Sequence, residues 1–114
     1  MKSKIEKKLD GEFEKFGVKP KIYHFTVDDI PCLPFKAVSV ITIDGRSWKR
    51  LYEIIEESSR FLLKCTHSYA TEMISMLQEK NIYGVAICDP RDQFNRKYGR
   101  IKAKGRLLQY LKSC

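Results

Sequence analysis

The chain has 114 residues, a formal net charge of +8 and 43% hydrophobic residues. This length suits one compact domain, and we expect a single domain over residues 1–114. The hydrophobic fraction excludes a disordered chain, and no apolar run approaches the roughly 20 residues of a membrane-spanning helix. The polar first residues do not resemble a signal peptide, so we expect a soluble, cytoplasmic protein.

Hydrophobic periodicity and turn residues predict seven elements along the chain. They are a helix over 2–16, strands over 21–27 and 36–43, a helix over 46–64, a shorter helix ending at residue 80, a strand over 82–88 and a helix within 91–112. The β-branched strand over 36–43 should lie centrally in the sheet. The order α-β-β-α-α-β-α predicts an α+β fold, with a sheet of three or more strands covered by helices.

The excess positive charge is concentrated in the last helical segment, where residues 91–112 hold eight Lys or Arg and one acid. Helical geometry puts five residues on one stripe that could be buried: Phe94, Tyr98, Ile101, Gly105 and Leu108. Burial of this stripe would turn two basic rows toward solvent, with Arg96, Lys97, Arg100 and Lys104 on one flank and Lys102 and Arg106 on the other. We predict that these six residues contact the phosphates of a nucleic acid, either DNA or RNA.

Two glycines leave the continuity of this last helix open. Gly99 and Gly105 each cost about 1 kcal/mol inside a helix. The helix therefore kinks or breaks there, or the missing side chains let a nucleic-acid backbone or another helix approach closely.

A second basic cluster opens the helix over 46–64, and it consists of Arg46, Lys49 and Arg50. Cations are disfavoured at the positive end of a helix dipole, so their presence there predicts a second phosphate-binding site. The alternative is an ordinary face with i,i+4 salt bridges, from Lys49 to Glu53 and from Glu56 to Arg60.

Two aromatic residues lie beside these basic clusters. Trp48 and Tyr98 could stack on bases, which would favour single strands or RNA. Both also fall on the stripes that we expect to be buried, and we therefore expect core residues.

The sequence predicts no catalytic residue, metal site or cofactor. The four cysteines form no C-x-x-C pair, and the spacing of Cys65 and His67 is poor for zinc. No nucleotide-binding or metalloprotease motif is present. Four acids at strand ends could hold Mg²⁺ in a nuclease, a minor alternative, although such acids more often form turns: Asp28, Asp29, Asp44 and Asp89.

The segment DQFNRKYGR at 92–100, continuing through Ala103 to Gly105 and Arg106, resembles the tail of small uncharacterised proteins of phages and other mobile elements. The resemblance covers only this C-terminal part and implies neither a known activity nor a catalytic residue. It suggests two roles, handling viral nucleic acid or disabling a host defence complex. An alternative function is therefore an inhibitor or adaptor that docks its basic surface on an acidic protein or a nucleic-acid-loaded complex.

Overall fold

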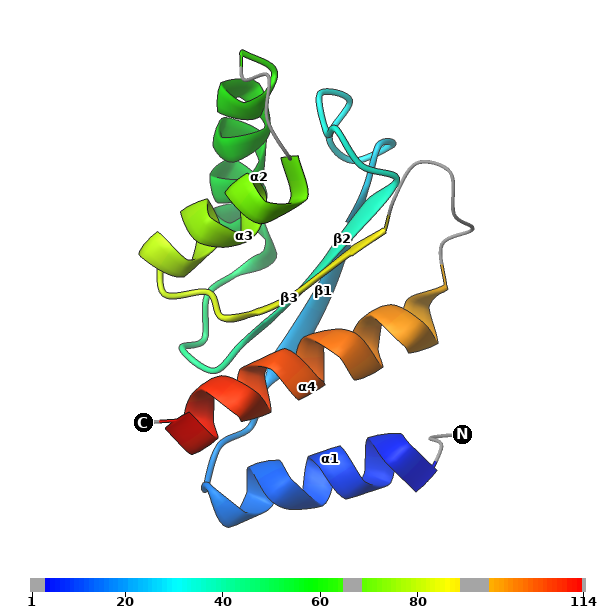
Figure 1. Ribbon diagram of the computed structural model, residues 1–114, viewed down its shortest axis with the longest axis vertical. Helices are drawn as coiled ribbons and strands as arrows, with labels where there is room; N and C mark the ends of the chain where they lie inside the picture. The colour runs from blue at the N-terminus through cyan, green and yellow to red at the C-terminus, as the bar shows by residue number, and fades with distance from the viewer. Residues whose placement is uncertain (1–3, 65–68, 89–94, 114) are drawn as a thin grey trace.

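A three-stranded antiparallel sheet with the order β1-β2-β3 lies at the centre of the computed structural model (Figure 1). The strands are β1 (Lys21–Thr26), β2 (Ala37–Thr42) and β3 (Gly84–Cys88), and the helices are α1 (Lys4–Lys15), α2 (Trp48–Leu62), α3 (Tyr69–Glu79) and α4 (Arg96–Ser113). The predicted α+β fold and the order of its elements are confirmed.

The structure describes residues 4–64, 69–88 and 95–113. Predictions about Cys65, His67, Asp89 and Phe94 lie outside these ranges. Among the described helices, none is long and apolar enough to cross a membrane.

Strand β2 is central, as its β-branched sequence predicts, and all six of its residues are buried. Successive side chains of a strand point to opposite faces. Val38 and Val40 therefore pack into the core beneath α2 and α3, whereas Ile41 packs into a second core beneath α4. The sheet separates the two cores, and each face is covered by its own helices (Figure 1).

Helix α1 lies alongside α4, on the side of the sheet opposite α2 and α3 (Figure 1). Phe13 anchors it in the second core with Ala103 and Leu107 of α4. The two helices run in the same direction, so both begin at the same end of the molecule (Figure 1). Ile5 near the start of α1 and Phe16 just after its end are exposed, whereas Phe13 is fully buried.

Candidate nucleic-acid interface

Helix α4 packs on the sheet through a different face from the one that its hydrophobic periodicity predicts. Gly99, Ala103 and Leu107 are buried, whereas Tyr98 is 59% exposed. A Cβ atom at Gly99 would lie 2.6 Å from the Ser39 Oγ atom of β2. Small residues let the helix approach the sheet this closely, and large ones there would clash. The prediction of a buried stripe through Tyr98 was therefore wrong, although Leu108 is buried as expected.

Helix α4 continues unbroken across both glycines. Asn95 precedes its first turn and accepts a hydrogen bond from the Tyr98 backbone N–H at 3.2 Å, the geometry of an N-cap. Gly99 serves the approach to the sheet, while a Cβ atom at Gly105 would meet nothing within 4 Å. The helix therefore does not break at either glycine, and of the two only Gly99 allows a close approach, which is to strand β2.

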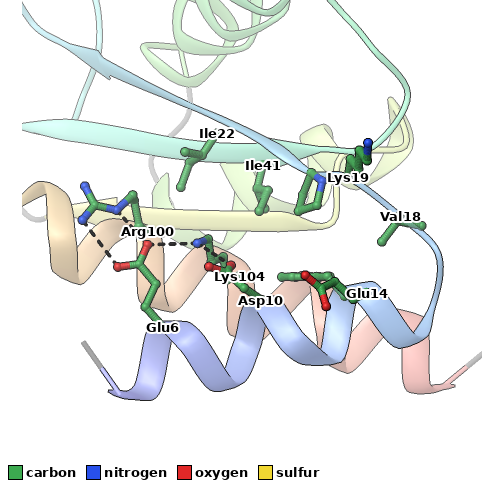
Figure 2. Close-up of a pocket in the computed structure, with 11 residues that line it drawn as sticks. Glu6, Asp10, Glu14, Val18, Lys19, Ile22, Ile41, Arg100 and Lys104 are labelled. Atoms are coloured by element: carbon green, nitrogen blue, oxygen red, sulfur yellow. Dashed lines mark hydrogen bonds and ion pairs between the residues drawn. The ribbon is translucent and has the colours of Figure 1, made fainter. Parts of the chain in front are cut away.

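Two residues of the predicted basic rows pair with acids on α1 and lie in a buried charge cluster (Figure 2). The Lys104 Nζ atom donates to Glu6 at 2.9 Å and to Asp10 at 2.8 Å, and the Arg100 Nε atom donates to Glu6 at 3.1 Å. Lys104 is 7% exposed and Glu6 is 1% exposed. The expectation that Lys104 faces solvent was wrong, because two acids one helical turn apart on α1 offset the cost of removing its charge from water.

The protonation of Glu6 follows from this pairing. Burial acts to raise the pKa of the Glu6 carboxyl, but hydrogen bonds and charge from Lys104 and Arg100 outweigh it, and the pKa lies below its usual value. Glu6 is therefore a carboxylate that pairs with both Lys104 and Arg100. Because these two cations are already paired, they have less attraction for an external phosphate than an unpaired cation has.

Arg106 also makes a contact within the fold, at the β3 edge of the sheet. Its guanidinium donates to the backbone carbonyl of Val85 in β3. This contact covers part of an edge strand, which would otherwise present backbone groups to other chains.

Three of the six predicted phosphate contacts remain exposed: Arg96, Lys97 and Lys102. The start of α1 adds three exposed lysines at the same end of the molecule (Figure 1): Lys4, Lys7 and Lys8. We call these six residues the basic end. Within 4–10 and 96–104 the sequence holds eight Lys or Arg and two acids, and the two acids are those bonded to Arg100 and Lys104. From the sequence alone the α1 lysines form an ordinary solvated face, because nothing local shows that α1 lies beside α4.

Tyr98 lies within the basic end and is not the core residue that we expected. The Lys102 Nζ atom sits 4.8 Å from the centre of its ring, one helical turn away. This cation–π contact holds the ring on the surface among positive charges.

His24 of β1 borders the basic end and was not singled out in the sequence. Its Nδ1 atom lies 2.6 Å from the Ser39 Oγ atom, on the face of the sheet that α4 covers. Burial, followed by the charges of Arg96 and Arg100, lowers the pKa of the imidazole. His24 is therefore neutral near pH 7 and adds no charge to the basic end.

The second predicted anion site keeps two exposed cations, Lys49 and Arg50. Arg46 is bonded to Asp44 at 2.7 Å. Ser47 caps α2 by accepting the Arg50 backbone N–H at 3.2 Å. Glu53, for which the sequence predicted a pair with Lys49, pairs with Arg50 at 3.6 Å. The predicted pair of Glu56 and Arg60 is present at 3.1 Å.

A cleft of about 510 Å³ opens between α1, α4 and the sheet (Figure 2). Its basic wall includes Arg100 and Lys104, but both are bonded to Glu6, and its floor includes the apolar Ile22 and Ile41. The cleft therefore offers mixed charge and does not extend the basic end.

Two of the acids considered for a metal site, Asp29 and Asp44, stabilise turns. Asp29 accepts the Thr26 backbone N–H at 3.0 Å, and Asp44 accepts the Arg46 backbone N–H at 3.2 Å. Over residues 4–64, 69–88 and 95–113, no three His, Cys, Asp or Glu side chains gather where they could hold a metal ion.

No family model, curated protein or solved structure matches this chain.

Proposed function

We propose that the protein binds nucleic acid through its basic end, with Arg96, Lys97 and Lys102 of α4 and the lysines of α1 contacting phosphates. The observation that carries the proposal is the pairing of two parallel helices whose N-terminal halves hold six exposed cations at the same end of the molecule. The acids of the same segments, Glu6 and Asp10, are bonded to Arg100 and Lys104.

Helix electrostatics supports this assignment. The first turn of α4 contains no acidic residue and begins with Arg96 and Lys97. Cations at the positive end of a helix dipole are unfavourable by about 0.3–1 kcal/mol each. A negatively charged partner offsets this repulsion, and the phosphate backbone of a nucleic acid is such a partner. The mobile-element resemblance of residues 92–106 suggests either a nucleic-acid partner or a host defence complex, and the helix electrostatics favours the first.

The test is a salt titration of binding to labelled duplex and single-stranded DNA and RNA. On duplex DNA, the slope of log K against log salt should flatten by about 0.9 for each phosphate that the protein no longer neutralises. We expect Arg96→Gln, Lys97→Gln and Lys102→Gln together to flatten it by about two to three units. Circular dichroism should be unchanged, because all three side chains are exposed.

A matched control removes the same charge elsewhere. Arg60, Lys64 and Lys80 are exposed on the α2–α3 side, and their triple Gln variant should bind like the wild type. An equal decrease in affinity in the two triple variants would show that net charge alone drives binding. Failure to bind any nucleic acid, with a stoichiometric protein retained from nuclease-treated lysate, would favour the inhibitor or adaptor instead.

A further inference from the structure

Trp48 lies at the start of α2 with 44% of its surface exposed, contrary to our expectation of a core residue. Its ring is stacked against Phe25 of β1, with 5.4 Å between ring centres, and lies 5.2 Å from the ring of Tyr52. Two aromatic neighbours thus hold the indole in one orientation while leaving a large part of it open to solvent. A rigid, exposed aromatic surface is what a stacking ligand requires.

The charges around the indole define the ligand. Lys49 and Arg50 follow it directly in the sequence, and both are exposed. The acids nearby leave this charge largely in place: Asp44 is bonded to Arg46, and the Arg50 pair with Glu53 joins two groups that are each more than half exposed. An exposed pair of this kind contributes about 0–1 kcal/mol and gives way readily to a phosphate.

Strand β1 connects this surface to the basic end. Phe25 supports Trp48 on one face of the sheet, while the neighbouring His24 faces α4 and lies near Arg96 and Arg100. Strand β1 is an edge strand of the sheet, and its neighbouring residues Phe25 and His24 face opposite sides of it. Residues about fifty positions apart in the sequence therefore flank the same strand.

We propose that Trp48 stacks on a base of a single-stranded nucleic acid whose neighbouring phosphates contact Lys49 and Arg50. An aromatic surface beside basic residues is the usual means of binding single strands without sequence choice. A duplex is excluded from this contact because its bases are already stacked and paired inside the helix. The inference rests on the proposed function and specifies it, by selecting single strands over duplex.

The experiment uses the full chain and a labelled oligothymidine of about 16 nucleotides, with a duplex of equal length beside it. Trp48 is the only tryptophan, so its fluorescence reports this site directly. We expect the oligothymidine to quench the fluorescence and the duplex to leave it unchanged. Trp48→Leu should weaken oligothymidine binding, followed by anisotropy, by about fivefold or more, while duplex affinity stays the same.

Two further variants separate stacking from structure. Trp48→Phe keeps an aromatic ring and should retain most of the single-strand affinity. Phe61→Leu removes another exposed aromatic residue near the far end of α2 and should have no effect. If Trp48→Leu binds oligothymidine like the wild type, or weakens both ligands equally, the stacking site is wrong while binding by the basic end stands. If the wild type binds neither ligand, the proposed function fails and the stacking site fails with it.

Discussion

The role of Lys104 in the structure differs from the role that the sequence predicts. In the sequence it belongs to a basic row, but in the fold it is removed from water and bonded to Glu6 and Asp10. A buried ion pair adds little net stability, yet the removal of one partner leaves an uncompensated buried charge. Lys104 is therefore required for the fold and is a poor candidate for a ligand contact.

We predict that Lys104→Met lowers the free energy of unfolding by about 3 kcal/mol, because Glu6 then remains buried with Arg100 as its main cation. Urea unfolding followed by circular dichroism measures the change. Lys102→Met, two residues away and exposed, should have almost no effect on stability and should weaken nucleic-acid binding. Equal urea midpoints for the two variants would contradict the buried cluster.

At the scale of elements, the packing of α4 on the sheet depends on one glycine and tolerates the other. Ser39, which a Cβ atom at Gly99 would meet, is itself buried and held by His24. Gly105 has open space around it. The same substitution should therefore have opposite effects at two positions of one helix.

We predict that Gly105→Ala stabilises the protein by up to about 1 kcal/mol, since alanine is the better helix former. Gly99→Ala should destabilise it, because overpacking typically costs about 1–3 kcal/mol and outweighs the gain in helix propensity. Adding Ser39→Ala to Gly99→Ala should restore part of the stability by removing the clashing oxygen. Thermal unfolding of these variants measures the effects, and stabilisation by Gly99→Ala would show that α4 lies further from β2.

The elements themselves could be read from the sequence, since periodicity and turn residues such as Gly17 and Asn81 are local signals. The buried face of α4 could not be predicted from the sequence. Gly99 and Ala103 carry little hydrophobicity, so a pattern of large apolar residues points away from them. The burial of Lys104 depends on Glu6, which lies 98 residues earlier and shows its role only once α1 lies beside α4. The exposed cations of α4 could be predicted from the density of charge in the sequence. That they lie at the same end of the molecule as the α1 lysines could be seen only in the folded structure.

At the scale of the whole molecule, stability should depend on pH through two side chains, His24 and Glu6. Folding lowers the pKa of each and so stabilises its deprotonated form. The pKa of His24 is lowered from 6.5 by burial and then by Arg96 and Arg100. The pKa of Glu6 is lowered from 4.5 because its two cations outweigh its burial. In each case the unfolded chain takes up the proton at a higher pH than the folded chain does, so acid favours unfolding.

We predict that stability is full above pH 6.5 and falls in two stages on acidification, first below 6.5 through His24 and then below 4.5 through Glu6. Urea midpoints measured from neutral pH to strongly acidic pH show the two stages. His24→Gln should remove the first stage and leave the second. A flat profile between neutrality and the onset of the Glu6 stage in the wild type would contradict the buried, neutral imidazole.

The pairing of α1 with α4 also sets an order of events during biosynthesis. Glu6 and Lys104 are separated by 98 residues, which a ribosome needs about 5 to 20 s to add. Throughout that interval α1 is an isolated helix of 12 residues, a length that is marginal in water. Helix α1 precedes the other described elements in the sequence and is thus among the last of them to settle, and a chain halted before α4 is made leaves Phe13 without its packing partners on that helix. Docking of α1 therefore requires that α4 has been made, and products truncated before α4 would expose an apolar surface to cellular proteases.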